Sequence, residues 1–196
     1  MTRLSWLRRG LLAKALILVC FGVGEGQSVA LVPADLQAVL FSKILSFDRN
    51  LSSQAGVRLE VLVLYQPDFP ESLRMAEDFS AGFHGAGIAD IAGRPLSITM
   101  VPFTKLDDLQ TALTGCNADI VYIAPLRAVN VRRLTEAMGV RSRTISPMRS
   151  YVEDGAAIGV ELRAGKPHIV VNLKAARAHG MDLSAQLLKL AEVIGS

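Results

Sequence analysis

Polar side chains that could bind a ligand follow four of the predicted strands, and each strand end also carries a proline. Ligands bind at the carboxyl ends of the strands in open α/β sheets, so these ends are the natural place to look for a site. The segments are Tyr65-Gln66-Pro67-Asp68, Pro102-Phe103-Thr104, Ala124-Pro125-Leu126-Arg127 and Ser146-Pro147-Met148-Arg149-Ser150. The alternative, that each proline only ends a strand, stays open. The predicted cleft for a small ligand or a partner's peptide consists of Asp68, Thr104, Pro125, Arg127, Ser146 and Arg149.

Catalytic and metal-binding chemistry has little support in the sequence. The chain has no G-x-S-x-G motif and only three histidines, His84, His168 and His179, which lie far apart and lack metal-ligand spacing. The glycine-rich segment 82–93 follows a predicted helix, whereas a phosphate-binding loop follows a strand and opens a helix. The sequence therefore predicts a protein that is not an enzyme and that needs no metal or cofactor.

The first 30 residues have the pattern of a secretory signal peptide. A basic start precedes the short apolar run Ala15–Val23, and Ser28-Val29-Ala30 is a small-x-small cleavage site. An uncleaved anchor is the weaker alternative, because the apolar run is too short to span a bilayer and Lys14 precedes it directly. We expect cleavage after Ala30, export of one mature domain at 31–196, and no direct membrane insertion of the mature chain.

Charge and cysteine content change once this leader is removed. The leader holds four of the 21 basic residues and one of the 18 acidic residues, so the mature chain carries 17 of each. The mature chain therefore has no net basic charge, and no nucleic-acid partner is predicted. Cys20 leaves with the leader, so Cys116 is expected to be a free thiol with no intrachain disulfide partner.

The hydrophobic pattern predicts alternating helices and strands. A polar loop is expected at Asp48–Ser53 and a looser stretch after Pro147. The last helix is expected to carry Leu183, Leu187 and Ile194 on one face, with Asp182 as N-cap and Gly180 ending the helix before it. This order predicts an α/β three-layer sandwich, a mostly parallel sheet with helices on both faces and an antiparallel hairpin near one edge. The predicted helices are 33–47, 71–83, 104–113 and 126–138, and the predicted strands are 57–65, 96–101, 118–124, 140–145, 157–163 and 166–173.

Several motifs occur in an order that resembles the YfiR-like (YfiR/HmsC) family. They are Gly115–Ile123, Tyr151–Val160, Val171-Asn172-Leu173-Lys174-Ala175-Ala176-Arg177 and Leu187–Ala191. The resemblance implies a periplasmic, non-enzymatic regulator that binds the outer portion of a membrane signalling protein, such as a diguanylate cyclase, and it allows a homodimer. Redox control through intrachain disulfides is not expected here, because Cys116 has no partner.

A second resemblance keeps another function open. The strands at Leu62–Tyr65 and Asp119–Tyr122 are similar to those in half of a periplasmic substrate-binding domain. A small-ligand role is therefore the alternative to the regulatory one.

Overall fold

The structure is a computed structural model that describes residues 31–53, 57–106, 109, 111, 113, 115, 117–138 and 142–195. The predicted leader, positions 107, 108, 110 and 112 of the predicted helix at 104–113, and Cys116 lie outside the described residues. None of the helices that the structure describes is both long enough and apolar enough to cross a membrane.

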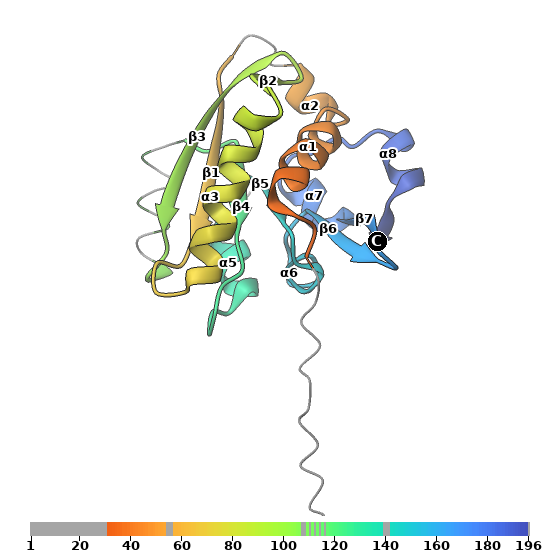
Figure 1. Ribbon diagram of the computed structural model, residues 1–196. Coiled ribbons are helices and arrows are strands. Elements are labelled where there is room, and N and C mark those ends of the chain that lie inside the picture. The colour runs from red at the N-terminus through yellow and green to blue at the C-terminus, as the bar shows by residue number, and fades with distance from the viewer. Residues whose placement is uncertain are drawn as a thin grey trace, which may run out of the picture.

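The described strands form one eight-stranded sheet in the order β2-β3-β1-β4-β5-β6-β7-β8 (Figure 1). The pairs from β3 through β6 are parallel, β6 and β7 form an antiparallel hairpin, and β8 runs parallel to β7. The predicted fold class is confirmed. The strands are β1 (Leu59–Tyr65), β2 (Asp90–Ile91), β3 (Arg94–Pro102), β4 (Ile120–Ile123), β5 (Arg143–Ser146), β6 (Ile158–Arg163), β7 (Lys166–Asn172) and β8 (Glu192–Ile194).

Helices cover both faces of the sheet because the central strands are apolar on both sides. In β4, Ile120 and Tyr122 belong to one buried cluster, while Val121 and Ile123 belong to the other. The first face is covered by α1 (Ala34–Leu45), α2 (Arg49–Ser52), α3 (Pro70–Gly85), α7 (Leu173–Ala178) and α8 (Ala185–Leu190). The second face is covered by α5 (Val131–Met138) and α6 (Arg149–Glu153).

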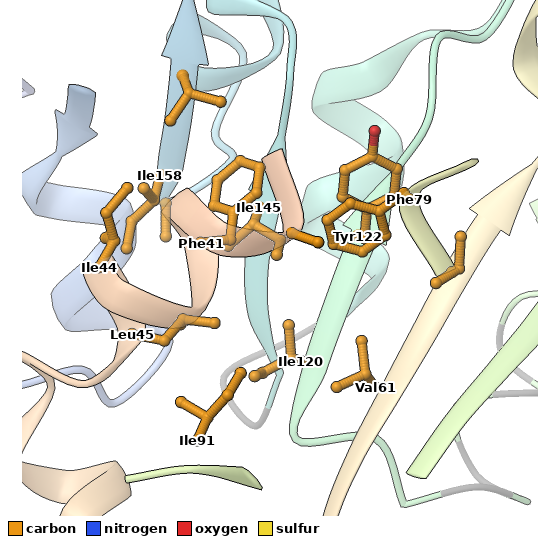
Figure 2. Packing of buried hydrophobic residues seen from close by; sticks show 14 of the residues in the cluster. Phe41, Ile44, Leu45, Val61, Phe79, Ile91, Ile120, Tyr122, Ile145 and Ile158 are labelled. Atoms are coloured by element: carbon orange, nitrogen blue, oxygen red, sulfur yellow. The ribbon is translucent and has the colours of Figure 1, made fainter. Parts of the chain in front are cut away.

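The aromatic rings of Phe41, Phe79 and Tyr122 pack among the aliphatic side chains of the first core (Figure 2). The rings of Phe79 in α3 and Tyr122 in β4 stack with their centroids 3.7 Å apart, and Phe41 in α1 meets both rings edge-on. The buried hydroxyl of Tyr122 donates a hydrogen bond of 2.8 Å to Gln37 Oε1, and Gln37 Nε2 donates one of 2.6 Å to the Val32 carbonyl. Burial raises the pKa of Tyr122, so this hydroxyl stays protonated. These contacts fix α1 and α3 on the sheet.

The predicted polar loop at Asp48–Ser53 is wrong in two respects. It contains the short helix α2, with the Asp48 side chain accepting a hydrogen bond from the Asn50 amide as N-cap. Asp48 is also fully buried, and its Oδ2 forms a 2.5 Å ion pair with Nε of Arg143 in β5. The Asp48 carboxylate can be buried because it pairs with Arg143, which lies 95 residues away in the sequence. Local sequence patterns do not reveal so distant a partner.

The predicted last helix is also wrong in its bounds. The helix α8 begins after Ser184, whose hydroxyl accepts a hydrogen bond from the Leu187 amide, and Asp182 is not its N-cap. It ends at Leu190, and the chain turns to form β8 beside β7. Pairing with an open sheet edge supplies hydrogen bonds that one more helical turn would otherwise make. The predicted stop at Gly180 fits the structure, since its φ is 70°.

Two other boundaries differ from the sequence pattern. The stretch after Pro147 contains α6, and α5 begins at Val131 rather than Leu126. The backbone of Leu126 is held by the Tyr151 hydroxyl, which accepts from its amide and donates to its carbonyl. This side-chain bridge takes up the backbone groups that a helix would use.

Candidate functional site

The carboxyl ends of β1, β3 and β4 lie together at one edge of the sheet, as predicted. The Phe103 amide donates to the Tyr65 carbonyl at 2.7 Å, and the Ala124 amide donates to the Leu64 carbonyl at 3.0 Å. The loops that carry Asp68, Thr104, Pro125 and Arg127 therefore follow neighbouring strands.

Arg127 contacts the loop after β1. Its amide donates a 2.7 Å hydrogen bond to Gln66 Oε1, and its guanidinium lies 4.3 Å from the centre of the Phe69 ring. A guanidinium over an aromatic face at this distance makes a favourable cation–π contact. Asp68 is exposed in the same loop, and Thr104 is exposed after β3.

Pro125 and Ser146 lie beneath this surface. Both are buried, and the Ser146 hydroxyl donates to the Ile123 carbonyl at 3.0 Å while accepting from the Met148 amide at 3.2 Å. Tyr151 joins α6 to the loop after β4 through its two hydrogen bonds with Leu126, and burial is the main cause that raises its pKa. The polar groups of Ser146 and Tyr151 thus hold the strand-end loops to one another.

Arg149 belongs to a charged cluster on α6, β6 and β8. The cluster consists of Arg149, Glu153, Glu161, Arg163 and Glu192. The Arg149 guanidinium bonds Glu153 at 2.9 Å, Glu161 at 3.1 Å and Glu192 at 2.5 Å, so it connects α6 with β6 and β8. Arg163 bonds Glu161 at 2.6 Å and Glu192 at 2.7 Å. Arg149, one of the six predicted site residues, therefore forms its ion pairs with carboxylates of its own chain.

Electrostatics in this charged cluster favour its ionised state. Hydrogen bonds from Arg149, and next from Arg163, lower the pKa of Glu192 to about 2. Hydrogen bonds to Glu192 and then Glu153 raise the pKa of Arg149, and hydrogen bonds to Glu192 and then Glu161 raise that of Arg163. Glu192, Arg149 and Arg163 are therefore charged across the physiological range of pH.

The sequence reading missed four members of the charged cluster. Arg149 and Glu153 are an i,i+4 pair, a signal that is readable only once α6 is recognised as a helix. Glu161 and Arg163 share one side of β6 by strand alternation. The hydrophobic pattern places Glu192 in the last predicted helix. It therefore gives no indication that Glu192 lies beside the other four residues of the charged cluster.

Some of the hollows among the described residues lie away from the strand ends. A groove of about 900 Å³ runs between α1 and α3. A smaller cavity of about 420 Å³ is lined by Arg132 and Glu136 of α5, Lys174 of α7 and His179. None of the six predicted residues lines either hollow.

His179 is the buried histidine of this smaller cavity. Its Nδ1 lies 3.1 Å from the Thr144 hydroxyl, and burial lowers its pKa, which favours the neutral ring. His84 and His168 are exposed on α3 and β7, so the structure keeps the three histidines apart. Among the described residues, no group of three His, Cys, Asp or Glu side chains is placed to hold a metal ion.

A family model described as YfiR/HmsC-like matches residues 34–192, from the first turn of α1 into β8. The chain belongs to the YfiR/HmsC-like family. The match includes the helices on both faces of the sheet and ends at the first residue of β8, so it covers nearly all of the described fold. No curated protein matches the chain.

Two solved structures resemble this YfiR/HmsC-like fold. One is an ABC domain in complex with L-Trp from Streptococcus pneumonia, with 14% identity, a TM-score of 0.60, and coverage of 83% of this chain and 62% of that one. The other is a conserved domain protein from Vibrio cholerae, with 18% identity, a TM-score of 0.54, and coverage of 82% and 60%. This chain thus spans less than two thirds of either structure, and the likeness shows the fold alone.

Proposed function

We propose that this protein is an exported regulatory binding protein of the periplasm that modulates a membrane-bound signalling protein, such as a diguanylate cyclase, through protein–protein contact. The observation that carries the proposal is the YfiR/HmsC-like match across residues 34–192. At the described strand ends, Ser146, Tyr151 and Arg149 bond groups of their own chain, so the proposed partner contact is not assigned to these three side chains.

Affinity capture tests the proposal directly. The full chain, tagged at its C-terminus and exported by its host, is used to retain proteins from detergent-solubilised membranes, with an unrelated exported protein carrying the same tag as control. We expect specific retention of a membrane cyclase or sensor kinase, identified by mass spectrometry. Deletion of the gene should change cellular cyclic-di-GMP, and a plasmid copy should restore it. A folded bait that retains no membrane protein, together with unchanged cyclic-di-GMP, would reject the regulatory function.

The second candidate function is binding of a small solute. The specific observation is the 420 Å³ cavity, whose lining combines Lys174 with the carboxylates of Glu136 and Glu153 and holds the ion pair between Arg132 and Asp154 at 3.3 Å. Such a mixture of charges suits a zwitterion such as an amino acid. A ligand at 100 times its Kd would stabilise the fold by about 2.7 kcal/mol, which a thermal-shift screen of amino acids detects. A screen without any rise in Tm would exclude an amino acid as the ligand.

A further inference from the structure

The groove between α1 and α3 runs along one side of α3, from Glu71 in its first turn to Gly85 at its end. The two helices lie side by side on one face of the sheet (Figure 1), and Gly82 permits their close approach, since a Cβ there would lie 2.9 Å from the Asp35 Cα. At 1.5 Å per residue, the 16-residue helix α3 offers a stripe about 24 Å long. The groove is lined on this side by Glu71, Arg74, Met75, Asp78, Ala81, Gly82 and Gly85 of α3, and by Ala86 just after the helix.

Apolar side chains line the opposite side of the groove. Leu36 and Val39 of α1 are 38% and 41% exposed, although the same helix buries Phe41 and Ile44 in the core. At the far end, a Cβ added to Gly85 would meet no atom within 4 Å, so this part of the groove is open. Large apolar side chains left uncovered beside open space are typical of a protein-binding groove.

The charges around the groove identify the kind of partner it fits. Three carboxylates, of Asp35, Glu71 and Asp78, line the groove together with one guanidinium, of Arg74. Within the part of the chain that the structure describes, none of these four side chains makes an ion pair. Cleavage after Ala30 would add an ammonium group at Leu31, and the carboxylates would still be in excess.

We propose that this groove binds an amphipathic helix of a partner protein, with apolar side chains on one face and lysine or arginine along its flanks. A helix fits an apolar groove of this length, and basic flanks would pair with the free carboxylates. A second copy of this chain fits poorly, because a two-fold axis through the groove would set the same three carboxylates against each other. The inference rests on the proposed function in one respect: the helix would belong to the membrane signalling protein.

The test uses two labelled 18-residue peptides, one of leucine and lysine in an amphipathic helical pattern and one with glutamate in place of lysine. Fluorescence anisotropy is measured against protein purified after export of the full chain. We expect saturable binding of the lysine peptide in the micromolar range, which weakens as salt rises, and no binding of the glutamate peptide.

Single substitutions locate the binding. Asp78→Lys reverses a charge in the groove, and Glu77→Lys reverses the neighbouring exposed carboxylate, which does not line it. We expect about a tenfold loss of affinity for the first and less than about a twofold change for the second, since 1.4 kcal/mol corresponds to a factor of ten. Gly85→Leu fills the open end with a better helix former and should also weaken binding. If Gly85→Leu does not fold, the two charge reversals still decide the result.

Several results would overturn the inference. These are absence of saturable binding by the lysine peptide, equal binding of both peptides, and equal affinities of the Asp78→Lys and Glu77→Lys proteins. A dimer in sedimentation that Gly85→Leu disrupts would show that a second copy covers the groove. Membrane capture separates this inference from the proposed function: if Asp78→Lys retains the same membrane protein as the wild type, the regulatory function stands and the groove proposal fails.

Discussion

The buried ion pair between Asp48 and Arg143 gives the sharpest stability prediction. Asp48 is fully buried and Arg143 is 6% exposed. Besides the ion pair, Asp48 Oδ1 accepts hydrogen bonds from the amides of Asn50 at 3.1 Å and Asp182 at 2.9 Å. Asp48→Asn keeps the shape but leaves the guanidinium uncompensated and turns one acceptor into a donor. Breaking a buried pair from one side costs about 3–5 kcal/mol, a large part of the 5–15 kcal/mol that holds an ordinary domain folded.

The assay is urea unfolding followed by far-UV circular dichroism, because the one tryptophan, Trp6, lies in the predicted leader. With a slope of about 2 kcal/mol per molar urea, the midpoint should fall by about 2 M. The matched control is Asp182→Asn, which removes the exposed pair with Arg49, where the side chains are 48% and 65% exposed. That control should cost less than about 1 kcal/mol.

A double variant separates charge burial from packing. Asp48→Leu with Arg143→Met removes both buried charges, so it should cost less than Asp48→Asn alone. The reasoning would be refuted if Asp48→Asn and Asp182→Asn shifted the urea midpoint equally.

Three further predictions concern other parts of the fold. Because the pKa of Glu192 is lowered to about 2, its ionised carboxylate stabilises the fold fully above the usual pKa near 4.5, and this stabilisation is lost as pH falls toward 2. Glu192→Gln should therefore lower the urea midpoint at pH 7, and the difference in midpoint from the wild type should shrink through this acid range. A difference that stays constant with pH would contradict this. Gly159→Ala should destabilise the protein by about 1–3 kcal/mol in urea unfolding, because a Cβ there would lie 2.5 Å from Val152 Cγ2; a neutral effect would show that α6 moves freely. Tyr122→Phe leaves Gln37 Oε1 buried without its donor and should lower stability by about 1–3 kcal/mol in thermal unfolding, whereas an unchanged Tm would mean that Gln37 finds another donor.

Most of the fold could be predicted from local patterns. The alternation of apolar strands and amphipathic helices predicted a mostly parallel α/β sheet, and the hairpin around Ala164-Gly165 fits the observed β6–β7 pair. The predictions were wrong where a residue distant in the sequence decides the local structure. Asp48 is buried because it pairs with Arg143, and the backbone of Leu126 is non-helical because it bonds the Tyr151 hydroxyl. The predicted end of the last helix was wrong because the chain pairs with the open edge of β7 instead of continuing as a helix. Helical periodicity in the sequence cannot reveal such an edge.

The site was predictable only in part. Strand polarity correctly placed the loops after β1, β3 and β4 side by side, because parallel strands end at one edge. Which of their side chains remain available was not predictable, since burial of Ser146 and engagement of Arg149 depend on α6, β6 and β8.

The sequence by itself determined the class of fold, its hydrophobic faces and its family resemblance, because periodicity and ordered motifs are properties of neighbouring residues. Only the tertiary structure decided which charges pair, which strand closes the sheet and where hollows remain. The physical reason is that ion pairs such as Asp48–Arg143, edge pairing by β8 and the groove between α1 and α3 arise from segments far apart in the chain. Their energies depend on distance and burial, which the order of residues does not contain.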